Sequence, residues 1–274
     1  MKNVKILIFD LDDTLVVEEG SAVAALEATA ELLSSYGIDK RKFAVTVREK
    51  ARELWKSMPT YPYCRDIGIS SWEGLWARFT GSGSQTGNGF VDGNNPRLNP
   101  HLLQLRSLKD QYHFNAWNNA LLCYDIQNKA LAKEMALQFN QERRKRHFQF
   151  PESAQVLEKL QHKYRMGLIT NGTPDLQWEK IRGSQVEHYF EKIIISGEVN
   201  VRKPQKEIFE HMFAFFQADK SRYLMIGNSL KSDIGGAVNA GIKSVWINRD
   251  NQLNDYGFKP DFEVRDLTQL FEFL

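Results

Sequence analysis

Residues 6–15 have the sequence Ile6-Leu7-Ile8-Phe9-Asp10-Leu11-Asp12-Asp13-Thr14-Leu15. An apolar run ends at a carboxylate, a second carboxylate follows two residues later, and a hydroxyl follows two residues after that. Taken alone, the segment also fits a strand followed by an Asx-type turn. A buried parallel strand has a continuous apolar run, however, and ligands bind beyond the carboxyl ends of such strands. Because an unpaired buried carboxylate is costly, we expect a positive charge beside Asp10, and a hard divalent cation is suitable.

Four later segments have the same character. Apolar runs end in small polar residues or glycine within residues 164–172, 192–198, 223–229 and 244–248. Between them, residues 153–162 and 206–216 have helical patterns. Strands that alternate with helices favour an α/β fold with a Rossmann-like parallel sheet. The polar residues that follow the strands are then expected to meet at one edge of the sheet.

In this order, the motifs resemble those of the haloacid dehalogenase (HAD) superfamily. They are Asp10-x-Asp12-x-Thr14, Thr170-Asn171-Gly172, Lys203-Pro204, and the segment from Gly227-Asn228 to Asp233. The resemblance covers residues 1–17 and about 150–274, which we expect to form the catalytic core.

The resemblance implies a role for each motif. Asp10 is the expected nucleophile and Asp12 the expected acid and base. The phosphate-binding residues implied by the family are Asp10, Thr170, Asn171, Gly172 and Lys203, with Thr170 and Lys203 also counted as catalytic. The implied cofactor is Mg²⁺, with Asp10, the backbone carbonyl of Asp12, Asn228 and Asp233 as its expected ligands.

One position departs from the family pattern. The fourth motif usually begins Gly-Asp, whereas this chain has Gly227-Asn228. An amide oxygen still ligates Mg²⁺ but carries no charge. Whether Asn228 or Asp233 ligates the metal directly stays open at this point.

Residues 18–149 differ from the rest, because they show helical periodicity and no strong strand pattern. In the family, an insertion after the first motif is a type I cap, so we predict an all-helical cap here. Residues 81–100 are rich in Gly, Ser, Asn and Gln and predict a long loop.

Two groups of side chains in this insertion have two interpretations each. The tryptophans at 55, 72, 76 and 117 either line a substrate pocket or pack a helical core. The basic run at 143–147 either attracts an acidic ligand or is a solvated helix end. We expect hinges at 16–19 and 148–151.

Composition narrows the class of protein. The 274 residues are 42% hydrophobic and carry a formal net charge of +2, too small to argue for nucleic acid. The two cysteines form no metal or redox pattern, and no apolar run is long enough for a membrane span. We expect a cytoplasmic protein whose partner is a small phosphorylated metabolite, with no membrane partner.

Several functions remain compatible with the sequence. The resemblance favours a Mg²⁺-dependent phosphatase that forms an aspartyl-phosphate. Phosphoserine, sugar phosphates and nucleotides all stay open as substrates. A dehalogenase of the same superfamily needs neither metal nor an acid such as Asp12. A phosphomutase has the same core motifs, and a catalytically weakened binding module is suggested by Asn228 alone.

Overall fold

The computed structural model describes residues 3–80 and 99–274, and the chain divides into two compact units. Unit 1 comprises Met1–Val17, Phe148–Gly172 and Glu179–Leu274. Unit 2 comprises Glu18–His147 and Thr173–Trp178. The loop expected at 81–100 falls almost wholly outside the described residues. In the ranges 3–80 and 99–274, no helix is long and apolar enough to cross a membrane.

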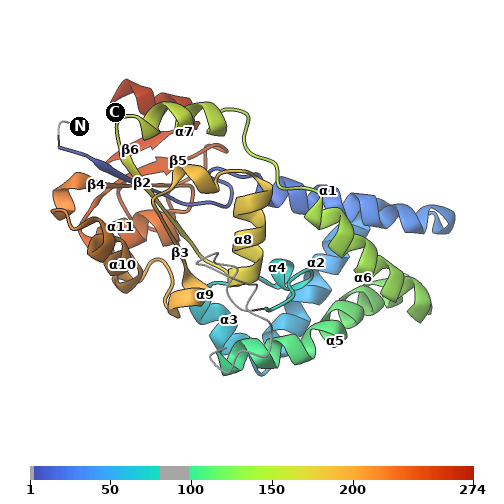
Figure 1. Cartoon of the computed structure of the whole chain (residues 1–274). Coiled ribbons are helices and arrows are strands. Elements are labelled where there is room, and N and C mark those ends of the chain that lie inside the picture. Colours follow the sequence, from blue (N-terminus) through green and yellow to red (C-terminus); the bar gives the residue numbers. More distant parts are fainter. Residues whose placement is uncertain (1–2, 81–98) are drawn as a thin grey trace. The chain divides into compact units, whose positions relative to one another are not determined.

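Unit 1 is built on a parallel sheet, which confirms the predicted fold class. Its strands are β1 (Ile6–Phe9), β2 (Arg165–Thr170), β3 (Lys192–Ile195), β4 (Tyr223–Gly227), β5 (Lys243–Ile247) and β6 (Phe262–Val264). In the described residues these six strands have the order β3-β2-β1-β4-β5-β6 and are all parallel (Figure 1). β1 lies in the interior of the sheet and is buried along its whole length, as its continuous apolar run predicts.

Helices cover the sheet of unit 1. They are α7 (Ser153–Gln161), α9 (Ser196–Val199), α10 (Lys206–Phe216), α11 (Gly235–Ala240) and the second half of α8 (Pro174–Gly183). α10 buries Ile208, Phe209 and Met212 against a cluster that includes β1 and β4 residues, and α11 adds Ala237 to it. The helices predicted at 153–162 and 206–216 are confirmed.

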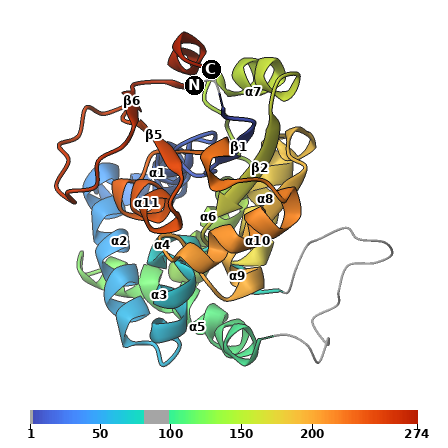
Figure 2. The same cartoon turned by 90° about the vertical axis from the view of Figure 1, so that its left-hand side faces the viewer.

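Unit 2 is helical in its described part. Its helices are α1 (Glu18–Ala30), α2 (Lys40–Ser57), α3 (Tyr61–Ile67), α4 (Ser71–Gly74), α5 (Pro100–Leu122), α6 (Lys129–Arg144) and the first half of α8. Side-chain caps begin several of them: Asp39 accepts a hydrogen bond from the Lys42 N–H at 2.9 Å, and Asn128 accepts one from the Leu131 N–H at 3.0 Å. α5 packs against both α2 and α6 (Figure 2).

The interior of unit 2 is aromatic. The tryptophans at 55, 72, 76 and 117 are all buried, and all belong to one hydrophobic cluster. Trp117 lies 5.6 Å from Phe139 and 6.3 Å from Phe43, measured between ring centroids. Of the two interpretations given to these residues, the packed helical core is the one that describes them.

The basic run at the end of α6 is not a wholly solvated helix end, so that interpretation is wrong for Arg143. The Arg143 side chain is buried, pairs with Glu18 and lies over the Trp76 ring at 4.8 Å. Arg146 and Lys145 both pair with Glu142. The guanidinium group of Arg143 lies over an aromatic ring and also pairs with a carboxylate. Sequence periodicity does not reveal such a contact.

The two segments that join the units pair with each other. The Val17 N–H donates to the Phe148 carbonyl at 2.8 Å, and the Phe150 N–H donates to the Leu15 carbonyl at 3.0 Å. Val16 and Gln149 form an antiparallel bridge. The chain passes between the two units at 17–18 and 147–148, which lie at or next to the expected hinges. Hinge motion stays a prediction.

Candidate active site

The strand register brings the ends of β1, β2 and β4 to one edge of the sheet. Phe9 is level with Leu168 on β2 and with Ile226 on β4. The residue after Phe9 is therefore level with the last residue but one of β2 and with the last residue of β4. Its N–H donates to the Ile226 carbonyl at 2.9 Å. This residue is Asp10, which is 7% exposed.

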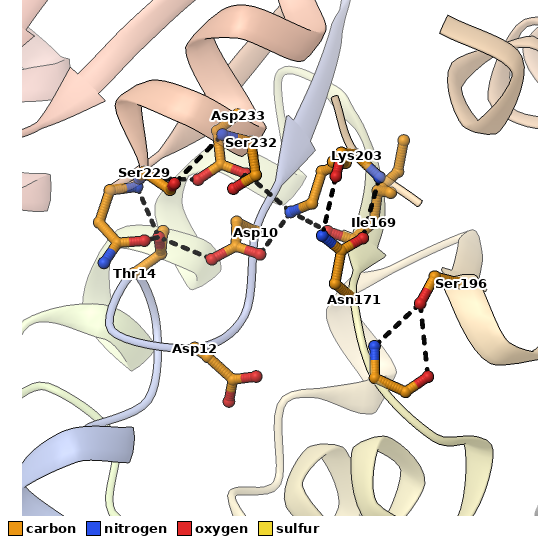
Figure 3. A network of polar contacts seen from close by, with 12 residues as sticks. Asp10, Asp12, Thr14, Ile169, Asn171, Ser196, Lys203, Ser229, Ser232 and Asp233 are labelled. Carbon is orange, nitrogen blue, oxygen red and sulfur yellow. Dashed lines mark hydrogen bonds and ion pairs between the residues drawn. The ribbon is translucent and has the colours of Figure 1, made fainter. Parts of the chain in front are cut away.

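Asp10, Lys203 and Asp233 form what we call the nucleophile cluster (Figure 3). The Lys203 ammonium lies 2.5 Å from Asp10 Oδ1 and 2.8 Å from Asp233 Oδ1. It also donates to the Ile169 carbonyl at 2.7 Å. Asp233 is 0% exposed and Lys203 is 1% exposed. Three segments that are far apart in the sequence thus meet at one ammonium group.

The cluster has one negative charge in excess. Burial raises the pKa of Asp10 to about 6, and the charge of Asp233 adds to this effect against the opposing influence of Lys203. Burial alone would lower the pKa of Lys203, but the charges of Asp10 and Asp233 raise it. The lysine is therefore held as a cation, and one more positive charge would neutralise the cluster.

Thr14 connects the first motif to the fourth. Its hydroxyl lies 3.1 Å from Asp10 Oδ2 and 3.4 Å from Asn228 Oδ1, and it accepts a hydrogen bond from the Asn228 N–H at 3.0 Å. Asn228 is thereby held next to the carboxylate of Asp10. The third residue of the first motif accordingly has a structural explanation, although only its two aspartates were assigned roles.

Gly227 is required by the carboxylate behind it. A Cβ atom at this position would lie 2.3 Å from Asp233 Oδ2, which no side chain tolerates. Asp233 Oδ2 accepts a hydrogen bond from the Ser229 N–H at 2.9 Å, so both Asp233 oxygens have partners in the chain. The fourth motif therefore closes around Asp233.

The second motif lies at the end of β2. Thr170 is its last residue and is buried. The Asn171 side chain makes two hydrogen bonds to the backbone of Lys203, donating to its carbonyl at 3.1 Å and accepting from its N–H at 2.9 Å. The Gly172 N–H donates to Ser196 Oγ at 2.9 Å. Asn171 therefore holds the segment that carries Lys203.

Asp12 lies apart from the nucleophile cluster. Its side chain is directed away from Asp10 (Figure 3). Both of its carboxylate oxygens lie 3.1 Å from the ammonium of Lys180 on α8. We call this contact the Asp12–Lys180 pair. The two aspartates of the first motif thus have different lysine partners.

The donors at the sheet edge fit a hard cation such as Mg²⁺. In the ranges 3–80 and 99–274, no group of three or more His, Cys, Asp and Glu side chains forms a metal site. The cluster nevertheless has the carboxylate of Asp10 next to the amide oxygen of Asn228, with one excess negative charge. Oxygen donors and excess negative charge suit Mg²⁺, which takes few protein ligands.

Three residues at this edge were not assigned roles from the sequence. Lys180 holds Asp12, Ser196 bonds to the backbone of Gly172, and Arg249 donates to the Thr14 carbonyl at 3.1 Å. Ser196 and Arg249 follow the ends of β3 and β5, so their position after an apolar run was a usable signal. Lys180 lies within a helix, and the only signal for it was that the segment after the second motif, with Lys180, resembles phosphatases of the family, which assigned the lysine no role.

A family model for haloacid dehalogenase-like hydrolases matches residues 4–241. The match spans the four motifs and the whole helical insertion at 18–149, and it confirms the resemblance inferred from the motifs.

Individual relatives agree with the family match. The chain is 31% identical to phosphoserine phosphatase from Thermus thermophilus, over 97% of this chain and 98% of that protein. It is 32% identical to N-acylneuraminate-9-phosphatase from Mus musculus, over 92% of this chain and 86% of that protein. Among solved structures, YfnB from Bacillus subtilis, bound to magnesium, has a TM-score of 0.65 and 20% identity, covering 98% of each chain.

Proposed function

The chain belongs to the haloacid dehalogenase-like hydrolases, and we propose that it is a Mg²⁺-dependent phosphatase that acts on a small phosphate monoester through an aspartyl-phosphate. The nucleophile cluster carries this proposal: a buried carboxylate at the end of β1 is held by a lysine that is itself held by a second carboxylate. The phosphatase relatives named above support the reaction class.

In the first half-reaction, an Asp10 oxygen attacks phosphorus while the ester bond to the leaving oxygen breaks. Asp12 donates a proton to that oxygen. Lys203, the Thr170 hydroxyl and the backbone N–H of Asn171 hold the other phosphate oxygens, where charge is spread in the transition state. The Gly172 N–H already donates to Ser196 Oγ, so it is left out of this set although the family resemblance implies Gly172. The substrate alcohol leaves and Asp10 carries the phosphoryl group.

In the second half-reaction, Asp12 takes a proton from water as the water oxygen attacks phosphorus. The bond between phosphorus and Asp10 breaks, its electron pair returns to the Asp10 carboxylate, and inorganic phosphate is released. Asp12 ends protonated, ready to act as the acid in the next cycle. One group thus serves both half-reactions.

We propose that Asp10, the backbone carbonyl of Asp12 and the amide oxygen of Asn228 hold Mg²⁺. Asp233 supplies negative charge from behind them, because both its oxygens already have partners in the chain. When bound, Mg²⁺ offsets the repulsion between the Asp10 carboxylate and the phosphate dianion.

We propose that unit 2 acts as a cap that opens for substrate and closes over the site. The paired segments at 16–19 and 148–151 would be its hinges, since a few residues at the ends of elements suffice for such motion. Cap side chains would then select the substrate.

The decisive experiment measures phosphate release by the purified protein with Mg²⁺ and with EDTA. p-Nitrophenyl phosphate tests the reaction, and a panel of phosphoserine, sugar phosphates and nucleoside monophosphates tests the substrate. We expect Mg²⁺-dependent release from the generic ester and a preference for one class in the panel. No release from any ester would refute the proposal.

Two further measurements separate the alternatives. Chloride release from 2-chloropropionate without Mg²⁺ would indicate a dehalogenase. An absolute requirement for a sugar bisphosphate activator would indicate a phosphomutase. We expect no chloride release, because a dehalogenase has no use for an acid such as Asp12. We expect no activator requirement, because the relatives named above are phosphatases.

A further inference from the structure

Lys180 is a buried lysine within contact of a catalytic carboxylate. It lies in α8, which is the helix that follows the second motif, and its side chain is 2% exposed. The side chain of Asp12 is 23% exposed, so solvent reaches the carboxylate but not the ammonium group. Burying an ammonium group is expensive unless it is paired.

The geometry of the contact is specific. The ammonium is equidistant from both Asp12 oxygens, at 3.1 Å from each. A cation that bridges both oxygens restricts rotation of the carboxylate about its last bond, whereas a cation at one oxygen leaves it freer.

We propose that Lys180 is a positioning residue, which holds the Asp12 carboxylate for the second half-reaction. The inference rests on the proposed phosphatase function. In that step, Asp12 is a carboxylate, and it accepts a proton as the water oxygen bonds to phosphorus and the phosphorus–Asp10 bond breaks. Lys180 keeps all its protons throughout and acts only through Asp12, whose two oxygens it contacts.

This role predicts an unequal effect on the two half-reactions. p-Nitrophenolate leaves with little need of a proton, so its release depends weakly on Asp12. Hydrolysis of the aspartyl-phosphate needs a correctly placed base whatever the substrate. Loss of Lys180 should therefore slow the second step selectively, and phosphoenzyme should accumulate.

The test uses Lys180→Met with p-nitrophenyl phosphate and Mg²⁺. We expect kcat and KM to fall together by about tenfold or more, with kcat/KM within about threefold of the parent. A rapid burst of nitrophenolate equal to the enzyme concentration should precede the steady state. Lys180→Arg keeps a cation and should restore most of kcat.

Arg182→Met is the matched control. It removes a cation from the same helix, two residues away, where the guanidinium pairs with Glu187 at the surface. We expect parental kcat and KM for this variant. If Lys180→Met does not fold, Lys180→Gln takes its place with the same readout, because it keeps a buried hydrogen-bond donor.

The outcomes separate the two proposals. A parent protein without phosphatase activity would refute the proposed function itself. An active parent, combined with a Lys180 variant whose kcat/KM falls as much as its kcat and shows no burst, would assign Lys180 a structural role and overturn the present inference. Parental kcat in the Lys180 variant would overturn it as well.

Discussion

The nucleophile cluster and the Asp12–Lys180 pair are built from the same residue types but differ in charge balance. In the first, one lysine serves two carboxylates that are almost fully buried. In the second, one lysine serves one carboxylate that solvent partly reaches. The first arrangement keeps a net negative charge that suits a cation, whereas in the second the lysine holds one carboxylate by both of its oxygens. Neighbouring aspartates of one motif thus acquire different chemistry from their partners.

The largest effect should come from Asp10→Asn. The change keeps the shape of the side chain but removes the nucleophile, so we expect phosphate release to fall by about a thousandfold or more. The assay is steady-state hydrolysis of p-nitrophenyl phosphate with saturating Mg²⁺.

Asp13→Asn is the control for that change. Asp13 has a φ of 55°, a conformation that Asn adopts as well as Asp does, and it lies in the same motif. We expect activity within about threefold of the parent for this variant, because it removes the same charge at a neighbouring residue that has no assigned part in the chemistry. Comparable losses in both variants would remove the distinction between the nucleophile and its neighbours.

Stability should separate the two lysines next. Lys203→Met leaves two buried carboxylates without their cation, and breaking such a pair costs about 3–5 kcal/mol. Lys180→Met leaves Asp12 partly hydrated, so we expect a cost of about 1–2 kcal/mol. Urea unfolding of both variants in EDTA measures the difference. Equal losses in the free energy of unfolding would show that Lys203 and Lys180 stabilise the fold to the same extent. That result would contradict the difference in charge balance between the nucleophile cluster and the Asp12–Lys180 pair.

Much of the fold was predictable because the sheet is parallel and buried. β1, β2, β4 and β5 each contain a buried apolar run, and such runs identify interior strands without knowledge of the tertiary structure. β6 was not predicted, since Phe262–Val264 is a three-residue edge strand with a central glutamate. Short polar edge strands depend on pairing with a neighbour rather than on their own pattern.

The candidate site was predictable only where motifs mark it. Asp10, Lys203 and Asp233 belong to three motifs, and the structure brings their side chains together. Lys180 and Arg143 are both buried cations within helices, where the sequence shows only a charged residue in a helical pattern. Their partners, Asp12 and Glu18, are more than a hundred residues away, so only tertiary packing determines these contacts.

The excess charge of the cluster predicts a pH-dependent stability. In the folded, metal-free protein, the pKa of Asp10 is raised from 3.8 to about 6. Between these values the folded state binds more protons than the unfolded state, so the free energy of unfolding falls as pH rises. Asp10→Asn lacks this titration and leaves a balanced pair of Lys203 and Asp233.

The measurement is thermal unfolding of the parent and Asp10→Asn in EDTA across that window. The free energy of unfolding of the variant should exceed that of the parent by an amount that grows from about pH 4 to about pH 6 and then levels off. The total change in this difference should be on the order of 1–3 kcal/mol. Added Mg²⁺ should stabilise the parent more than the variant. A constant difference in the free energy of unfolding between about pH 4 and about pH 6 would show that burial does not raise the pKa of Asp10.

The smallest expected effect concerns Asn228. A carboxylate is a stronger ligand for a hard cation than an amide, and the side chain at 228 is held beside Asp10 through Thr14. Asn228→Asp should therefore lower the Mg²⁺ midpoint for activity by about tenfold, at the cost of more repulsion in the metal-free protein. Asn254→Asp, the same chemical change at an exposed position, should leave the midpoint unchanged.

A Mg²⁺ titration of both variants decides whether position 228 contacts the ion. An unchanged midpoint in Asn228→Asp would mean that position 228 does not reach the ion. A raised midpoint would mean that the site already holds as many carboxylates as it accommodates, in which case the nucleophile cluster, like the Asp12–Lys180 pair, is electrically complete when its metal is bound.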